Sequence, residues 1–372
     1  MARVLRWARG VAGVCVALAC DRASEVAKTK ASGPSSPPLV TQSSELSSAP
    51  LRIAYSDWPG WVAWQVAIDK HYFEELGVKV NFVWLEYTPT IEAFSEGQVD
   101  AVCMTNGDAL MAGSSGAPSV GILINDYSNG NDMLVARAGI EHVRDLRSKK
   151  IGVEVGVVDH LLLMEALGSA GLGEADVEII NTKTEKTPEL LRSGNVDAIA
   201  AWQPHSGHAL LLSPGSKALF TSANVPGLIY DLLFVSRSSL QGRRADWLKV
   251  VAAWFRVVEF ISDPNHRAEA LQIMAQRVGL APESYAKLMG GTLLLGPREN
   301  QQRFGTAPGF QSVTGSSQIV DRFNVRNHVY KAHVDVSPYF DRSLVEEVLH
   351  ENGTAASPAL QGGSSGGGGH AG

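Results

Sequence analysis

Cysteine is scarce in this sequence. The 372-residue chain contains three cysteines, and two of them, Cys15 and Cys20, lie in the N-terminal apolar segment. Cys103 is then the one thiol that follows residue 20, which excludes a framework of disulfides in the body of the chain. Because Cys103 stands inside an apolar run, we expect it to be a packed strand residue.

A surplus of positive charge is also missing. The chain has 32 Lys and Arg against 38 Asp and Glu, for a net charge of −6. Nucleic acids and anionic membranes are bound by clustered Lys and Arg, so we expect neither as a partner. No segment beyond the N-terminus is apolar enough to predict a membrane helix. The 45% of apolar residues nevertheless suffices for a large core and two domains.

The N-terminus has the pattern of an export signal. Three arginines in the first nine residues precede an apolar run over 11–19 that is too short to span a bilayer. Leu18-Ala19-Cys20 resembles a bacterial lipobox, in which Cys20 would be acylated, although Ala17 stands where that pattern usually has Leu. We expect residues 1–20 to be a lipoprotein-type signal peptide; the alternative is an ordinary signal peptide that leaves Cys20 as a free thiol.

Two segments lack the apolar periodicity of folded structure. Residues 21–50 are rich in Ser, Pro and Ala, and residues 351–372 are rich in Gly and Ser. Such compositions bury too little surface to fold. We interpret the first as a disordered tether and the second as a flexible tail.

One motif occurs twice at the spacing of a domain. Gly-x-Val-Asp-Ala begins at Gly97 and again at Gly194, and both copies follow a strand pattern, a helix pattern, a second strand pattern and a Thr-Pro pair. The predicted strands cover 52–55, 78–85, 151–153 and 177–180. Both halves therefore have the order β-α-β-α-β, which predicts an α/β fold of two lobes, each a mostly parallel sheet flanked by helices.

Two apolar segments beside turns, near residues 131–140 and 226–240, are expected to link the lobes. We assign 51–135 to the first part of lobe 1, 136–232 to lobe 2 and 233–350 to a return to lobe 1 with C-terminal helices. An apolar stripe from Trp247 to Val258 recurs at helical spacing and predicts a core face.

The order of these elements resembles the periplasmic binding proteins of ABC importers, specifically the nitrate/sulfonate/taurine-type group, over about residues 51–350. The resemblance implies the type II periplasmic binding protein fold, with a ligand cleft between the lobes, and a membrane permease and ATPase as partners. "MTNGDAL" (104–110) and "DYSNGND" (126–132) further resemble the branch encoded near urea carboxylase and guanidine-utilisation genes.

Ligands of open α/β sheets bind beyond the carboxyl ends of the strands, and aromatic and acidic residues gather there in both halves. The candidate ligand-binding residues are Asp57, Trp58, Trp61, Thr105, Asn106, Asp108, Asp126, Glu154, His160, Trp202, Gln203, Tyr230 and Asp231, with Asp159 and His205 beside them. Lys and Arg are absent from these loops. Asp100 and Asp197 precede their strands, at the opposite edge, and are expected to be structural.

This chemistry favours a cation or a planar amide-like solute. Two desolvated carboxylates would repel an anion by several kcal/mol, on the order of magnitude of Coulomb's law. A Trp face attracts a cation by about 0.5–2 kcal/mol, and a carboxylate accepts paired N–H donors. Guanidinium, urea-like, amidine or quaternary ammonium solutes fit. Asp108 has an alternative role in the first turn of a helix whose N-cap is Thr105 or Asn106, and Trp64 is expected in the core.

No pattern predicts catalysis. The spacing of His160, His205, Glu154 and Asp159 matches no metal motif, and no base is implied beside Cys103. We expect no metal, no cofactor and no enzymatic activity. The enzymatic alternative is a pyrimidine-synthase-like protein of this fold, which the export signal disfavours.

We therefore predict an exported, monomeric solute-binding lipoprotein of an ABC importer, located in the periplasm or cell envelope and held to the membrane only by its N-terminal lipid. It captures a small nitrogen-containing solute, preferably guanidine-like, urea-like or an amine cation, by closing two lobes. The alternative ligands are nitrate, a sulfonate such as taurine, and a pyrimidine precursor; the alternative function is a ligand-sensing lipoprotein without a transporter.

Overall fold

The structure is a computed structural model that describes residues 49–355, all within one compact unit. The expected signal peptide with Cys20, residues 21–48 of the expected tether and residues 356–372 of the expected tail lie outside the described residues. The last helix continues to Ala355, past residue 351, where the sequence predicted the tail to begin. Among residues 49–355, no helix combines the length and apolarity that crossing a membrane requires.

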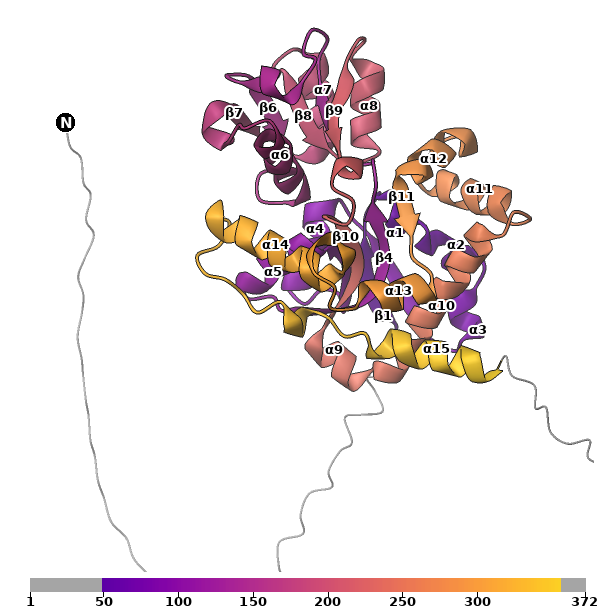
Figure 1. The fold of residues 1–372 in the computed structure, drawn as a ribbon. Coiled ribbons are helices and arrows are strands. Elements are labelled where there is room, and N and C mark those ends of the chain that lie inside the picture. The colour runs from indigo at the N-terminus through magenta and orange to yellow at the C-terminus, as the bar shows by residue number, and fades with distance from the viewer. Residues whose placement is uncertain (1–48, 356–372) are drawn as a thin grey trace, which may run out of the picture. The chain divides into compact units, whose positions relative to one another are not determined.

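Two sheets organise the described chain (Figure 1). The first sheet, of lobe 1, has six strands in the order β11-β4-β10-β3-β1-β2. Its N-terminal elements are β1 (Leu51–Tyr55), α1 (Pro59–Val62), α2 (Trp64–Asp69), α3 (Tyr72–Glu75), β2 (Val80–Trp84), α4 (Tyr87–Ser95), β3 (Ala101–Thr105), α5 (Asn106–Ser114) and β4 (Ser119–Ser128).

The second sheet, of lobe 2, has five strands in the order β7-β6-β8-β5-β9. Its elements are β5 (Met133–Ala136), β6 (Lys150–Val153), α6 (Val158–Ser169), β7 (Glu178–Asn181), α7 (Thr187–Arg192), β8 (Ala198–Ala201), α8 (His205–Leu212) and β9 (Lys217–Thr221).

The chain then returns to the first sheet and ends in helices. These elements are β10 (Tyr230–Ser236), α9 (Arg237–Gly242), α10 (Arg244–Ser262), α11 (Arg267–Arg277), α12 (Pro282–Leu288), β11 (Thr292–Leu294), α13 (Pro297–Arg303), α14 (Val313–Arg326) and α15 (Ser343–Ala355). In Figure 1, α14 lies beside α5, and the two helices are in contact. The C-terminal third therefore completes lobe 1.

The predicted β-α-β-α-β order is present in both lobes, with the same strand order. β1 pairs in parallel with β2 and β3, and β6 pairs in parallel with β7 and β8. The crossing strands β5 and β10 are antiparallel to their neighbours. Both sheets are therefore mixed, because a strand that arrives from the other lobe enters in the opposite direction.

The crossing strands shift the expected lobe boundaries by a few residues. Met133 pairs with Ala201, so β5 belongs to the second sheet, although 133–135 were assigned to lobe 1. Asp231 pairs with Thr105 and with Asp126, so β10 belongs to the first sheet, although 230–232 were assigned to lobe 2. Each crossing strand forms its ladder as soon as it reaches a sheet, because unpaired backbone groups are costly to bury.

The two crossings are hydrogen-bonded to each other. The hydroxyls of Ser128 and Ser222 are 2.6 Å apart, and the Gly130 amide donates to the Ser222 hydroxyl at 2.7 Å. The Ser222 amide in turn donates to the Asp132 carbonyl at 3.0 Å. These bonds tie the segment before β5 to the segment after β9, which fixes the residues that connect the lobes.

The repeated motif has the same structural role in both lobes. Gly97 and Gly194 adopt left-handed backbone with φ of 71° and 74° just after helices α4 and α7, where glycine is favoured. Asp100 accepts the Arg52 amide at 2.8 Å, and Asp197 accepts the Lys150 amide at 2.9 Å. Each aspartate thereby joins the start of its strand to the start of the neighbouring strand, which confirms the structural interpretation.

The core contains the residues that the apolar patterns indicated. Cys103 and Trp64 are fully buried, and Trp64 packs on Trp254 of α10 with ring centroids 4.7 Å apart. The stripe on α10 is buried throughout. The helix pattern between the first two predicted strands is divided into α1, α2 and α3. His71, between α2 and α3, has a left-handed φ of 58° that a continuous helix cannot accommodate.

Candidate functional site

Aromatic side chains form the walls of a cavity between the lobes. Trp58 and Trp61 follow β1, Tyr87 is the first residue of α4, and Trp202 follows β8. Trp61 stacks on Tyr87 with centroids 5.3 Å apart, and Trp202 of lobe 2 meets Tyr87 edge-on at 5.2 Å. The cavity leaves about 10 Å³ for the centre of a water-sized sphere, which is about what one water molecule needs. A ligand of few heavy atoms suits it.

Local sequence places these rings at the carboxyl edge. Pro59 opens α1 directly after Trp58, and a proline at that position predetermines the helical φ. The Trp58 indole donates to Asp126 Oδ1 at 2.9 Å. Gly60 allows this approach, since a Cβ at residue 60 would lie 1.9 Å from Asp126 Oδ2. The turn after β1 is thereby held against β4.

Five buried aspartates lie at or beside the cavity. They are Asp108 on α5, Asp126 on β4, Asp132 before β5, Asp159 on α6 and Asp231 on β10, each 3% exposed or less. Asp132 and Asp231 line the cavity directly. Asp126 faces Asp231 across the β4–β10 ladder, and Asp108 accepts hydrogen bonds from Tyr87 and Thr105. Lobe 2 contributes Asp159.

Burial raises the pKa of all five carboxyls. Desolvation raises the pKa of Asp108 to about 6 and those of Asp126 and Asp132 to about 7. The pKa values of Asp159 and Asp231 rise well above the ordinary range, because neighbouring carboxylates add repulsion to desolvation. A hydrogen bond from protonated Asp231 to Asp126 favours the neutral form of the first and the charged form of the second.

Several of these oxygens have no hydrogen-bond partner in the protein. Oδ2 of Asp126, Asp132 and Asp231 and both carboxyl oxygens of Asp159 are buried without one. Among residues 49–355, no ion pair connects any of the five to Lys, Arg or His. The site is therefore a buried acidic cluster that lacks a positive partner.

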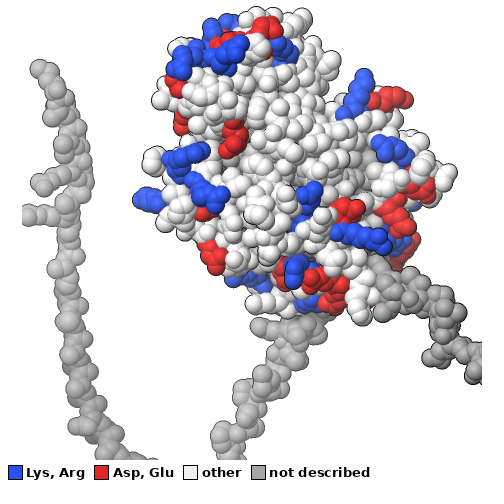
Figure 2. All heavy atoms as spheres, in the orientation of Figure 1, with Lys and Arg blue, Asp and Glu red and all other residues white. Residues whose placement is uncertain are grey.

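The surface of lobe 2 shows the opposite arrangement. Lys and Arg lie next to Asp and Glu over its elements in Figure 2, and the pairs there include Arg147 with Asp176 and Arg192 with Glu189, 2.6 Å apart. Exposed pairs of this kind contribute little to stability. The five buried carboxyls at the cavity would gain most from a positively charged partner, and the described part of the chain gives them none.

The structure places five predicted residues at the cavity wall. These are Trp58, Trp61, Thr105, Trp202 and Asp231. Two more adjoin it through hydrogen bonds to wall residues, Asp126 to Trp58 and Asp108 to Tyr87. Thr105 is also the N-cap of α5, where its hydroxyl accepts the Asp108 amide. Thr105 and Asp108 therefore form the start of α5 and also lie at or beside the cavity.

Asn106 and Tyr230 do not line the aromatic cavity, although Asn106 lines a neighbouring one. The Asn106 amide donates to Ser316 and Ser317 of α14 and accepts the Tyr230 backbone amide, so its polar groups are occupied. The Tyr230 hydroxyl donates to the Phe310 carbonyl at 2.8 Å. Tyr230 precedes Asp231 in a strand, where successive side chains point to opposite faces, so the two cannot both face the ligand.

The remaining predicted residues bridge the lobes or lie beside the cavity. Asp57 approaches His205 of α8 at 3.2 Å, and Glu154 of lobe 2 accepts the Thr88 hydroxyl of lobe 1 at 2.6 Å. Hydrogen bonds from Lys183 and Thr88 outweigh desolvation and lower the pKa of Glu154. The Gln203 side chain turns back to the start of α8, where it accepts the Gly207 amide. His160 borders a neighbouring cavity.

Four wall residues of the aromatic cavity were not predicted from the sequence: the apolar Val158 and Ile229, and Tyr87 and Asp132, which bear polar groups. Tyr87 follows the carboxyl end of β2, so the edge rule that selected the other candidates would have found it if applied to that strand. Asp132 is the last residue of "DYSNGND". This string suggested a family resemblance, but Asp132 was not among the candidate ligand-binding residues. Its position at a crossing between sheets is a tertiary property.

Two observations on the described residues concern metal binding and thiol chemistry. Residues 49–355 contain no group of three or more His, Cys, Asp or Glu placed to hold a metal ion. Burial raises the pKa of the Cys103 thiol far above neutrality, which keeps it protonated. The cavity itself offers aromatic faces, carboxyl oxygens, the hydroxyls of Thr105 and Tyr87, and the unpartnered indole N–H of Trp61.

A family model described as the NMT1-like family matches residues 44–275, more than half of the sequence. The chain belongs to the NMT1-like family. A family relative in sequence is a candidate binding protein of Brucella abortus (strain 2308), 26% identical over 219 residues that cover 58% of this chain and 68% of the relative.

Solved structures share the two-lobed fold of this NMT1-like chain. The periplasmic aliphatic sulphonate binding protein of Escherichia coli has a TM-score of 0.66 at 20% identity and covers 79% of this chain and 92% of that one. The ligand-binding component of an ABC-type import system from Staphylococcus aureus gives 0.66 at 13%, covering 80% and 98%. The nitrate-binding protein of Synechocystis PCC 6803 gives 0.65 at 10%, covering 81% and 88%. These similarities confirm the predicted two-lobed α/β fold.

An enzyme also shares this fold. The desulfurization enzyme DSZB has a TM-score of 0.61 at 15% identity and covers 82% of this chain and 99% of that one. Fold alone does not decide between binding and catalysis, so the chemistry of the site has to do so.

Proposed function

We propose that this protein is the exported solute-binding component of an ABC importer and that it captures a small nitrogen-containing cation, preferably guanidinium-like, between its lobes. The observation that carries the proposal is the acidic cluster around the aromatic cavity. Asp132 and Asp231 line the cavity with an unpartnered oxygen each, and Asp126 and Asp159 add more.

A buried carboxylate without a partner costs several kcal/mol, and a planar cation with several N–H groups supplies what these oxygens lack. Charge-assisted hydrogen bonds to carboxylates are about twice as strong as neutral ones. The surrounding rings add a cation–π attraction of roughly 0.5–2 kcal/mol. Together these terms can reach the roughly −8 kcal/mol of a micromolar complex.

The second candidate ligand class is the anion class of the structural neighbours, whose names state sulphonate and nitrate. Helix N-termini can bind such anions without basic residues. In this site an anion would face Asp132 and Asp231 across a cavity that no Lys or Arg lines. Neutral carboxyls would remove the repulsion, so anion binding would require all of them to stay protonated.

The cellular role follows from the same proposal. A ligand that contacts Asp231 in lobe 1 and Trp202 in lobe 2 favours the closed state by its contacts to both lobes. The closed form would be delivered to a permease and its ATPase. Acylation at Cys20, a monomeric state and membership of the guanidine-associated branch belong to this proposal, and a ligand-sensing lipoprotein is its rival.

Calorimetry on the purified protein at pH 8 tests the ligand class. The protein is titrated at one fixed ionic strength with guanidinium, methylammonium, choline, urea, taurine and nitrate. We expect micromolar binding of guanidinium and at least a hundredfold weaker binding of taurine and nitrate. Tight binding of an anion with no response to any cation or to urea would refute the proposal.

A matched pair of isosteric variants locates the ligand. Asp231→Asn removes a carboxyl group that can ionise when a cation binds, and it is expected to weaken guanidinium binding at least thirtyfold. Asp100→Asn removes a carboxylate at the opposite edge of the same sheet, where Asp100 binds Arg52, and is expected to leave the affinity unchanged. Equal losses in both variants would mean that the effect comes from stability and not from ligand contact.

A further inference from the structure

A second cavity adjoins the aromatic one. It leaves about 20 Å³ for the centre of a water-sized sphere, is partly open to solvent, and shares three wall residues with the aromatic cavity: Thr105, Val158 and Ile229. We call it the His160 cavity, because His160 of α6 forms part of its wall. A solute held at Asp231 and Asp132 could extend past the shared residues into this space.

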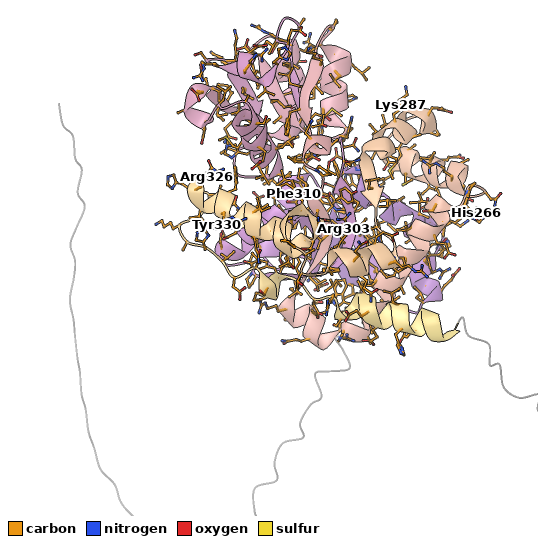
Figure 3. All side chains as sticks on the ribbon, viewed as in Figure 1. His266, Lys287, Arg303, Phe310, Arg326 and Tyr330 are labelled. Atoms are coloured by element: carbon orange, nitrogen blue, oxygen red, sulfur yellow. The ribbon has the colours of Figure 1, made fainter. Side chains whose placement is uncertain are left out.

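The wall of the His160 cavity is largely apolar. Val157 and Leu161 come from the start of α6, and Val320 and Phe323 come from α14 of lobe 1. Figure 3 labels Arg326 and Tyr330 where α14 ends and the chain continues beyond it. Because α6 belongs to lobe 2 and α14 to lobe 1, both lobes enclose this space, as they enclose the aromatic cavity.

The other polar side chains of this wall already have partners inside the protein. Thr105 and Asp108 bind each other, and Asn106 binds Ser316 and Ser317. Asn324 of α14 is hydrogen-bonded to Tyr330. Because these polar groups already form hydrogen bonds within the wall, they have little hydrogen-bonding capacity left for a ligand.

His160 differs from them. The residue is 4% exposed, and neither ring nitrogen, Nδ1 or Nε2, has a hydrogen-bond partner in the protein. Burial lowers the pKa of His160, so the ring is neutral at pH 7 and presents one N–H donor and one acceptor nitrogen. A buried polar group without a partner destabilises the ligand-free protein, and a ligand atom that pairs with the ring would remove that cost. The ring also borders a wider groove between the lobes.

We infer that the natural ligand is a substituted guanidinium or amidinium whose short substituent lies in the His160 cavity and ends in a neutral hydrogen-bonding group that pairs with His160. This inference rests on the proposed function, because the charged head must occupy the aromatic cavity. The apolar wall contacts the carbon atoms of the substituent, and its terminal hydroxyl or carbonyl meets the imidazole.

Calorimetry with three ligands tests the inference: guanidinium, N-propylguanidinium and N-(3-hydroxypropyl)guanidinium. We expect the propyl compound to bind about tenfold more tightly than guanidinium and the hydroxypropyl compound about tenfold more tightly again. In His160→Phe, a ring of similar size without nitrogen, the gain from the hydroxyl should disappear while the gain from the propyl chain remains. His208→Phe, which changes an exposed histidine on α8, serves as control and should retain both gains.

The outcomes separate this inference from the proposed function. Guanidinium that binds while neither substituent improves affinity would overturn the role of the His160 cavity and leave the ligand class intact. A hydroxyl gain that survives His160→Phe would overturn the pairing with His160. Failure of all three ligands to bind would refute the proposed function itself. Thermal unfolding of each variant at the assay pH shows whether it is folded.

Discussion

Replacement of Asp132 by Asn should stabilise the ligand-free protein at pH 8 and abolish cation binding. Asp132 is fully buried at the cavity, and its pKa of about 7 compares with an ordinary value of 3.8. That difference corresponds to about 4 kcal/mol of penalty on the charged form at pH 8. The Asn amide has a cost of its own, about 1–3 kcal/mol if one N–H stays unpaired. The net gain is about 1–3 kcal/mol, or about 2–4 °C in Tm for each kcal/mol.

The effect should depend on pH with a defined sign. Because the pKa of Asp132 is raised in the folded state, its contribution to stability is fully present below about pH 4 and is lost as the pH rises through about 7. At pH 5 the folded-state carboxyl is protonated and only about 1.6 kcal/mol of the penalty is present. The cost of the Asn amide offsets this amount, so Asp132→Asn should be no more stable than the natural protein at pH 5.

Thermal unfolding at pH 5 and pH 8, with and without guanidinium, measures both effects. The natural protein should gain stability from guanidinium at pH 8, whereas Asp132→Asn should not. Asp100→Asn, which breaks the pair with Arg52, should lower Tm at both pH values. A Tm change of the same size and sign at pH 5 and pH 8 for Asp132→Asn would refute the reasoning from buried charge.

Three further predictions concern the same site. Guanidinium affinity should rise about tenfold per pH unit between pH 5 and pH 7 and level off above pH 8, since binding displaces a proton from carboxyls such as Asp126 with a pKa of about 7; a flat calorimetric profile would contradict this. Trp202→Leu should weaken guanidinium about tenfold or more through loss of the cation–π face, while urea, which is uncharged, should lose less. Gly60→Ala should lower Tm by several degrees, because the added Cβ would overlap Asp126; Gly173→Ala, at a site with open space around its Cβ, is the matched control in the same unfolding assay.

The strand and helix order was predictable because it depends on local periodicity. Apolar alternation and turn residues mark β1 and β6, and the repeated glycines at 97 and 194 mark the ends of α4 and α7. The structural role of Asp100 and Asp197 followed from their position before a strand. Each of these inferences needs only neighbours in sequence and the rule that parallel strands share an edge.

The lobe boundaries were predicted a few residues too late. The sequence pattern of 131–140 and 226–240 indicates strands but not the sheet in which they pair. Pairing of Met133 with Ala201 and of Asp231 with Thr105 is a contact between segments far apart in the chain. Local periodicity carries no information on such a choice.

By itself, the sequence determined an α/β chain of two similar halves, a cysteine-poor body without clustered basic charge, and carboxyl edges rich in Trp and Asp. Tertiary structure alone decided which edge residues meet. It brought in Tyr87 and Asp132, turned Tyr230 to the opposite face from Asp231, and used Asn106 to hold α14. The physical reason is that only a few of the edge residues point into the cavity, because successive side chains of a strand face opposite ways and the lobes meet over part of the edge. The carboxyls among these few are buried without positive partners, and this burial creates the site.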